Sequence, residues 1–392
     1  MGTDGGTGPV VKFNTNVKLT KAQKKAPYVW TGRYLNGKPV FFVPTLSVIK
    51  FRSAFEHKLL CDGPTFTLGL ACFFSCAFCY VVTNLCRHAA VLRIMKETGL
   101  TFDQIAIVRN DPLPVLRSQL VNRKDRRKYN DPEDRRVVYA SPLVDVAANL
   151  ETARQTIEAC RLILQNTEWQ IRLLSKSALL KMVAEALAEY KDRVIYGLST
   201  GTFDDKLAMS FERGTSSPTA RLRSLYWMQD NGYRTYGMIC PSLPQEDYDA
   251  FAKEAVSRIR ADRCEHVWGE VINVRGKSLA ATVAGLRAGG FEEQAKVLEA
   301  VSGAKHKAAW EQYARNTFLA LSRVVSPKKL RFMQYVQEGK LDWWQQQKSL
   351  GALLLGKHAK VECPSPETAK SNSGGKRAVG QPTMDVTIKS NN

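Results

Sequence analysis

The stretch TFTLGLACFFSCAFCY, residues 65–80, joins an apolar segment to a loop that carries three cysteines. The apolar run Thr65–Leu70 predicts a strand, and the segment that includes Val91–Glu97 predicts a helix. Between them lie Cys72, Cys76 and Cys79. A strand, a loop and a helix in this order form the first unit of an α/β chain with a parallel sheet.

The same alternation of strand and helix continues along the chain. Helices are predicted at about 149–164, at Ala178–Tyr190 and at Pro218–Asp230, the last ended by Asn231-Gly232. Further strands are predicted at Arg136–Ala140, Gln170–Leu174, Val194–Ser199, Thr235–Cys240, closed by Pro241, and His266–Val271. Six βα units over roughly 210 residues are too few for an eight-unit barrel, so we expect a partial (β/α)6 TIM-type barrel with its chemistry at the carboxyl ends of the strands.

Four regions are predicted from the changes in composition. Residues 1–64 form a basic N-terminal extension, and residues 65–275 form the partial barrel. Beyond Val274 the pattern is wholly helical, which gives a helical C-terminal region at 276–356. Its helices are expected at Leu279–Arg287, Glu292–Val301 and Ala308–Val324. Residues 357–392 are rich in Pro, Ser, Gly and Lys and are predicted to be a disordered tail.

The composition narrows the class of protein. The chain of 392 residues has 44% apolar residues, enough for a sizeable core, and a net charge of +20 from 57 basic and 37 acidic residues. The start of the chain lacks a secretory signal pattern, and the apolar run Thr65–Val82 is interrupted by glycine, serine and cysteines. We therefore expect a cytoplasmic protein with no membrane partner. Nine scattered cysteines favour reduced thiols and metal ligation over a disulfide framework.

The C-x3-C-x2-C spacing of Cys72, Cys76 and Cys79 favours an iron–sulfur site. A structural zinc site usually needs four protein ligands, and no second Cys/His pair lies nearby at finger spacing. Three thiolates on one loop suit a [4Fe–4S] cluster whose fourth iron is open to a substrate or cofactor. The alternatives are a zinc knuckle or three buried cysteines. Cys86 is not expected to be a fourth ligand, because it would close that open position.

C-x3-C-x2-C followed by the aromatic Tyr80 resembles the signature of the radical S-adenosylmethionine (SAM) enzymes. The resemblance implies that the three cysteines bind a [4Fe–4S] cluster that chelates the methionine end of SAM. It further implies reduction by a donor such as flavodoxin or ferredoxin, cleavage of SAM to a 5′-deoxyadenosyl radical, and hydrogen abstraction from a substrate. A cysteine loop after the first strand would lie at the catalytic end of a barrel.

The segment from about Phe66 to Leu243 resembles spore photoproduct lyase and its DNA repair photolyase-like relatives, most clearly in LLSKSALL and in ERGTSS at 212–217. By position, Tyr80 would present its backbone to adenine, while Lys176 and Ser199 would contact the ribose or methionine end of SAM. Ser141, Glu212 and Arg213 complete the expected cofactor-binding set, although the last two could instead form a surface ion pair.

One departure from that family concerns the substrate. Where spore photoproduct lyase has a hydrogen-donating cysteine after the second strand, this chain has Ala140 and Ser141. Cys240, Cys264 or a tyrosine could replace it, with simple packing as the alternative role of the two cysteines. The departure counts against thymine-dimer repair and favours a different substrate.

Most of the excess positive charge lies outside the predicted barrel, and the excess within the barrel lies in one insert. Residues 1–60 hold ten basic and two acidic residues, residues 305–340 hold eight and two, and the insert 122–136 holds seven and four. Aromatic residues follow the N-terminal lysines, which is typical of nucleic-acid binding surfaces. We expect a radical SAM enzyme that acts on DNA or RNA through these extensions. The alternatives are modification of a peptide, protein or cofactor precursor, and a non-enzymatic iron–sulfur or zinc protein that binds nucleic acid.

Overall fold

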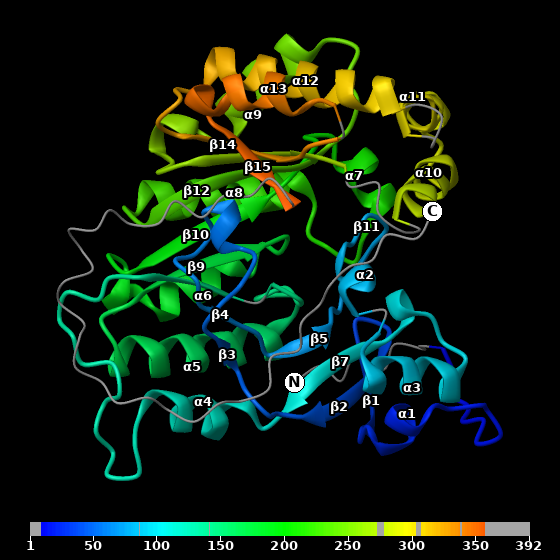
Figure 1. The fold of residues 1–392 in the computed structure, drawn as a ribbon, viewed down its shortest axis with the longest axis vertical. Helices are drawn as coiled ribbons and strands as arrows, with labels where there is room; N and C mark the ends of the chain where they lie inside the picture. Colours follow the sequence, from blue (N-terminus) through cyan, green and yellow to red (C-terminus); the bar gives the residue numbers. More distant parts are fainter. Residues whose placement is uncertain are drawn as a thin grey trace. The chain divides into compact units, whose positions relative to one another are not determined.

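A nine-stranded sheet forms the centre of the structure, a computed structural model that describes residues 9–85, 87–140, 142–272, 278–302, 307–337 and 339–356. Its strands are β3 (Ile49–Lys50), β4 (Thr65–Phe66), β8 (Val137–Ala140), β9 (Gln170–Ser175), β10 (Val194–Ser199), β12 (Arg234–Ser242), β13 (Val267–Val271), β14 (Leu330–Tyr335) and β15 (Ala352–Leu355). From β4 to β15 every neighbouring pair is parallel and the strands follow chain order, while β3 is antiparallel to β4 (Figure 1). The strands' carboxyl ends therefore meet along one edge.

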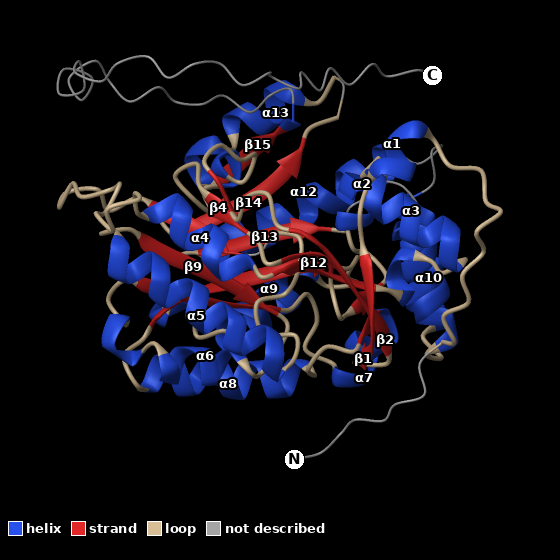
Figure 2. Cartoon of the chain, turned by 90° about the horizontal axis from the view of Figure 1, so that it is seen from below, coloured by secondary structure: helices blue, strands red, loops and turns tan. Residues whose placement is uncertain are grey.

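Helices connect these strands and cover one face of the sheet. In Figure 2, α5, α6 and α8 lie side by side along the strands. The connecting helices are α4 (Pro112–Leu120), α5 (Leu150–Asn166), α6 (Leu180–Ala186), α7 (Asp205–Phe211), α8 (Pro218–Asp230), α9 (Tyr248–Arg258), α10 (Ser278–Ala288), α11 (Glu292–Ser302), α12 (Lys307–Val324) and α13 (Leu341–Gln346). In β10, Val194, Tyr196 and Leu198 face this helix layer, and Ile195 faces the other side. The alternation follows from the two-residue period of a strand.

The opposite face of the sheet packs against the segment that follows the short 3-10 helix η1 (Glu56–Lys58). Leu60 and Cys61 form one buried cluster with side chains from six strands: Tyr139, Ile195, Tyr236, Met238, Trp268, Met333 and Leu355. The Trp268 indole donates a hydrogen bond of 2.8 Å to the carbonyl of Lys58. The sheet remains open among the described residues, since its edge strands β3 and β15 do not pair with each other.

The N-terminal region forms a second, four-stranded sheet in the order β1-β2-β7-β5. Its elements are β1 (Val29–Leu35), β2 (Lys38–Pro44), β5 (Gly69–Ala71) and β7 (Ala106–Asn110), with α1 (Lys21–Lys25), α2 (Val81–Leu85) and α3 (Ala89–Thr98) nearby. The predicted N-terminal extension thus contributes strands of its own. Gly69 permits the close pairing of β5 with β7, because a Cβ there would lie 2.8 Å from the Ile107 carbonyl oxygen.

The α/β class and the six predicted strand positions are confirmed, with changes at two strands. The predicted strand Thr65–Leu70 is split: Thr65 and Phe66 pair in the large sheet, and the chain then turns into β5 of the small sheet. The Thr67 hydroxyl donates to the Gly69 carbonyl at this turn. The fifth strand does not stop at Pro241 but continues to Ser242, with an irregularity in its pairing after Ile239.

The prediction of a wholly helical region beyond Val274 was wrong. Helices α10, α11 and α12 lie where they were expected, but β14 and β15 extend the parallel sheet beyond β13. Phe332 of β14 and Trp344 of α13 are buried and stack with their rings 6.0 Å apart. The aromatic residues near the C-terminus therefore complete the core.

The structure bears only in part on the predictions about the membrane, the C-terminal tail and Ser141. No helix among the described residues has both the length and the apolar character that crossing a bilayer requires. The predicted tail 357–392 and Ser141 lie outside the described residues.

Candidate active site

The cysteine loop is held to the rest of the protein by a short two-stranded ladder. In it, β6 (Ser75–Cys76) pairs antiparallel with β11 (Glu212–Arg213), so Cys76 lies opposite Glu212. The next residue, Ala77, donates its N–H to the Phe211 carbonyl at 2.8 Å. The sequence element that carries the thiols is thus fixed against the segment that follows α7.

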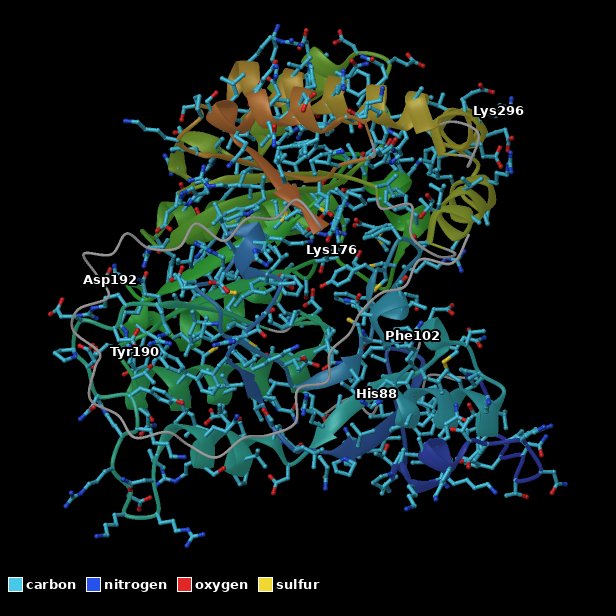
Figure 3. All side chains as sticks on the ribbon, in the orientation of Figure 1. His88, Phe102, Lys176, Tyr190, Asp192 and Lys296 are labelled. Atoms are coloured by element: carbon cyan, nitrogen blue, oxygen red, sulfur yellow. The ribbon has the colours of Figure 1, made fainter. Side chains whose placement is uncertain are left out.

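The loop opens onto a cavity of about 210 Å³ at the carboxyl ends of the parallel strands. Most of the predicted site residues line it: Cys72, Cys76, Cys79, Tyr80, Lys176, Ser199 and Cys240. Figure 3 labels Lys176 beside the strand ends. The fold therefore brings together residues that are up to 168 positions apart in the sequence, as expected for a site built from several βα loops.

The three thiols lie in a setting that keeps them protonated while no metal is bound. Burial raises the pKa of Cys72 to about 12 and also raises the pKa values of Cys76 and Cys79. Backbone N–H groups of Phe74 and Asp145 donate to the Cys72 sulfur at 3.5 and 3.3 Å. Ligation requires thiolates, so metal binding here would release protons.

The donor set suits an iron–sulfur cluster better than a closed zinc site. The cysteine loop supplies three thiols, the lining has no histidine, and the thiol of the fourth lining cysteine, Cys240, donates to Glu270. The two carboxylates of the lining, Asp145 and Glu270, already accept hydrogen bonds or pair with a cation. Among the described residues, no group of three His, Cys, Asp or Glu side chains is already gathered closely enough to hold a metal ion. The residue types fit a cluster that takes three thiolates.

Lys38 of β2 holds the backbone of the cysteine loop by hydrogen bonds. Its ammonium donates to the carbonyl oxygens of Cys72 and Phe74 at 3.0 and 2.6 Å. Burial lowers the pKa of Lys38, and the nearby thiols Cys72 and Cys76 act in the opposite direction. A cation at this place favours negative charge on the cysteine sulfurs.

Lys176 belongs to a buried ion network. Its ammonium donates to Glu212 at 2.7 Å, to the Cys240 carbonyl at 3.1 Å and to the Ser199 carbonyl at 3.4 Å. Glu212, which is only 1% exposed, also accepts from the fully buried guanidinium of Arg221. The two cations share one carboxylate, so the network has net positive charge beside the cavity.

The alternative of a surface ion pair between Glu212 and Arg213 was wrong. Neighbouring residues on a strand point to opposite faces, so Glu212 is buried against Lys176 and Arg221 while Arg213 is exposed. Neither residue lines the cavity. Sequence reasoning missed Arg221, whose position in α8 gave no signal of burial.

Ser199 and Tyr80 line the cavity but already have hydrogen-bond partners. The Ser199 hydroxyl donates to the Cys240 carbonyl at 2.9 Å, and the Tyr80 hydroxyl donates to the Pro142 carbonyl. The backbone carbonyl of Tyr80 accepts from the N–H groups of Thr83 and Asn84 at the start of α2. These bonds fix the two residues in place.

The two candidate hydrogen donors are in different environments. Cys240 lines the cavity, and its thiol donates to Glu270 at 3.6 Å. Cys264 is 2% exposed, lies in the main core and faces Gln229 and the Ile259 carbonyl. Burial and the nearby Glu270 raise the pKa of Cys240, so it keeps its hydrogen at neutral pH.

Three charged residues that line the cavity were missed by the sequence reasoning. Lys58 pairs with Glu270 at 3.9 Å and lies 5.6 to 5.9 Å from the ring centres of Phe55, Tyr80 and Tyr335. Burial acts to lower the pKa of Lys58, but Glu270 and neighbouring groups raise it overall.

Asp145 is the third missed residue. Its carboxylate accepts from the Ser175 hydroxyl at 2.7 Å and from the Lys176 and Ala147 N–H groups at 2.8 Å, and burial raises its pKa. It follows β8, so its place after a predicted strand was the available signal.

The chain is similar to solved spore photoproduct lyases, which are radical SAM enzymes. One structure, in complex with dinucleoside spore photoproduct, matches 71% of this chain and 72% of its own at 13% identity, with a TM-score of 0.45. A mutant with bound AdoMet and dinucleoside spore photoproduct matches 57% of this chain at 15% identity, with a TM-score of 0.41. This chain spans 61% of the length of that protein.

Among curated proteins, the uncharacterized protein ORF301 of Acidianus two-tailed virus is 24% identical over 234 residues, 57% of this chain and 71% of that protein. No family model matches the chain. The likeness to these proteins is partial, so the residues around the cavity carry the functional conclusion.

Proposed function

We propose that this protein is a radical SAM enzyme with a nucleic-acid substrate. Among the described residues it has an open sheet with eight parallel strands, in place of the six βα units expected from the sequence. The observation that carries the proposal is the cavity at the strand ends, which Cys72, Cys76 and Cys79 share with Lys176 and Cys240. The three cysteines would hold a [4Fe–4S] cluster. Together with SAM and an electron from a flavodoxin- or ferredoxin-type donor, that cluster supplies hydrogen-abstracting radical chemistry.

The protein's own residues have distinct parts in this proposal. The Lys176–Glu212–Arg221 network sets a positive potential beside the cysteine loop, which suits the carboxylate of SAM. Ser199 and Tyr80 shape the adjoining wall. Ser141 remains a further candidate for cofactor contact, whereas the exposed Arg213 does not line the cavity. The apolar lining, which includes Phe55, Leu174 and Met238, excludes water from a reactive site.

Cys240 is the proposed hydrogen donor to a substrate carbon radical. Its S–H bond would break as the new C–H bond forms, and the sulfur radical would then take one electron from the donor protein and one proton. Its place in the cavity supports this role over Cys264, which is buried in the core away from the cavity.

The nucleic-acid substrate is supported by the distribution of charge. The net charge is +20, and the segment 1–60 holds ten basic residues against two acidic ones. DNA photoproduct lyase-like repair and base modification both fit a polyanionic substrate and hydrogen abstraction. A cytoplasmic location fits the same proposal.

Anaerobic reconstitution with iron and sulfide tests the chemistry. We expect a brown protein that forms 5′-deoxyadenosine from SAM under reduction, and a Cys76→Ala variant that loses both colour and cleavage. Cys160→Ala is the matched control, since Cys160 is buried in α5 and does not line the cavity. A colourless protein with stoichiometric zinc, or SAM cleavage retained by Cys76→Ala, would contradict the proposal.

A further inference from the structure

A second, larger cavity adjoins the cysteine cavity. It has a volume of about 1020 Å³ and is lined by residues of the small sheet, of β3 and β4, and of α2 and α3. Phe55, Pro142 and Leu143 line both cavities, so these three residues form the wall between them. We call the larger space the Arg109 cavity, after the residue that distinguishes it.

Arg109 of β7 is a cation whose hydrogen-bonding capacity is only partly used. Its Nη1 donates to the Ser47 carbonyl at 2.5 Å, but its Nε is buried and has no hydrogen-bond partner. No carboxylate in the described part of the chain forms an ion pair with it. A buried N–H without an acceptor destabilises the folded state, so an acceptor that arrives with a ligand would be bound favourably.

The other polar groups around Arg109 favour a negatively charged ligand. Lys50 and His88 also line this cavity, and its described lining residues include no aspartate or glutamate. Burial and the nearby Arg109 lower the pKa of His88, so its imidazole is a neutral hydrogen-bonding group. Figure 3 labels His88, the residue that precedes α3. The amino end of α3 lies on the same cavity wall and adds to the positive potential that Arg109 and Lys50 set there.

The remaining walls are mostly apolar. Leu46 is 90% exposed at this cavity, and Val48, Leu70 and Leu85 line it as well. A free phosphate ion would fill only a small part of about 1020 Å³. A cation set among apolar walls suits a ligand that has both a phosphate and a flat, apolar face, as a nucleotide within a strand does.

We propose that Arg109 binds a backbone phosphate of the nucleic-acid substrate in this cavity, with an adjacent nucleotide directed toward the wall of Phe55, Pro142 and Leu143. The site deepens the proposed function, because it supplies the step by which a polyanion would be held beside the cysteine cavity. It rests on the proposed substrate class but not on cluster chemistry, so the two are tested separately.

The test measures binding of a single-stranded 12-residue DNA, and of the matching RNA, to the reconstituted full chain over a series of salt concentrations. We expect Arg109→Ala to weaken binding by about 10- to 100-fold, the usual effect of losing a hydrogen bond to a charged group, and to reduce the salt slope by about one. Arg109→Lys keeps the charge and is expected to lose less affinity. Arg258→Ala is the control, because it removes an equal charge from a residue that lines neither cavity and is paired with Glu254.

Each outcome decides between defined alternatives. Unchanged affinity and salt slope in a folded Arg109→Ala protein overturns the phosphate site. Equal competition by a 12-residue polyglutamate overturns the preference for phosphate. If Arg109→Ala loses oligonucleotide binding while the parent protein fails to cleave SAM, the phosphate site is supported and the proposed radical chemistry is contradicted. If the parent protein cleaves SAM and Arg109→Ala binds the oligonucleotide as the parent does, the radical chemistry is supported and the phosphate site is contradicted.

Discussion

Glu212 is a carboxylate at 1% exposure that neutralises part of the charge of Lys176 and Arg221. Arg221 is fully buried, and its other hydrogen bonds go to the Ser216 and Ser199 carbonyls and to the Thr215 hydroxyl. These neutral acceptors solvate the guanidinium but do not cancel its charge. The carboxylate is therefore required by the fold as well as by the proposed site.

Glu212→Gln should lower the free energy of unfolding by about 3 to 5 kcal/mol, because it leaves a buried cation without its counter-charge. Arg213→Gln, one residue further along the same short strand, should change it by no more than about 0.5 kcal/mol, since Arg213 is exposed. Urea unfolding of the parent and both variants measures this difference. Equal stabilities for the two variants would show that the network does not hold the fold.

Cys240 and Cys264 provide a second comparison at the level of single residues. Cys240→Ala should leave SAM cleavage intact but reduce substrate-derived product about 100-fold, within the range expected for losing a positioned hydrogen-transfer group. Cys264→Ala should keep the product yield, because Cys264 does not line the cavity. Chromatography of 5′-deoxyadenosine and of the nucleic-acid product measures both quantities. A normal product yield from Cys240→Ala would exclude it as the donor.

At the scale of elements, α13 shows how the C-terminal strands are held. Trp344 is fully buried against Phe318 and Phe332, and its indole donates to Glu311 of α12 at 2.8 Å. Its neighbour Trp343 is half-buried, with its ring 4.3 Å from the Arg315 guanidinium. The two adjacent tryptophans thus differ in burial but not in size.

Trp344→Ala should cost about 3 to 5 kcal/mol of unfolding free energy, since it leaves a large cavity and removes a donor from Glu311. Trp343→Ala should cost clearly less, because its ring is partly hydrated already. Urea midpoints of both variants, read by circular dichroism, give the comparison. If Trp343→Ala were the more damaging change, the core would not extend to α13 as described.

The elements that sequence predicted best were long and periodic. Pro218–Asp230 is a helix at the predicted bounds, because Ser217 caps it and Asn231-Gly232 ends it. By contrast, β14 and β15 are short apolar runs, and such runs do not distinguish strand from helix. β14 is a strand because it pairs with β13, about 60 residues earlier in the chain, and β15 is a strand because it pairs with β14.

The site residues also fall into those that the sequence predicts and those that it does not. The spacing of Cys72, Cys76 and Cys79 by itself indicates a ligand set, because the three thiols are close together in the sequence. Lys58 and Glu270 give no such signal, because a lysine and a glutamate 212 positions apart look like ordinary surface residues. The fold brings them together because η1 packs on the face of the sheet opposite the helix layer. This contact joins residues far apart in the sequence, so a local sequence pattern does not predict it.

At the scale of the whole molecule, His266 makes the free energy of unfolding depend on pH. Burial, followed by the nearby Arg331 and Arg172, lowers its pKa from 6.5 to about 4, and its Nδ1 is buried without a partner. The folded state therefore disfavours the protonated imidazole, whereas the unfolded state accepts a proton at about pH 6.5. Its contribution to stability is complete above about pH 6.5 and is lost as the pH falls toward 4.

His266→Gln should accordingly lose less stability than the parent between about pH 7.5 and about pH 5. Urea midpoints at the two pH values measure the difference, and the higher pH serves as the reference for any packing change. An equal fall in both proteins would assign the acid sensitivity to groups other than His266.

The ladder between β6 and β11 has a consequence for how Cys76 can be varied. It fixes the backbone at Cys76 against Glu212 and Phe211 through main-chain pairing, which does not use the thiol. A change of the Cys76 side chain therefore removes one proposed ligand and leaves the path of the loop unchanged, so loss of metal from such a variant would report on the ligand and not on the fold.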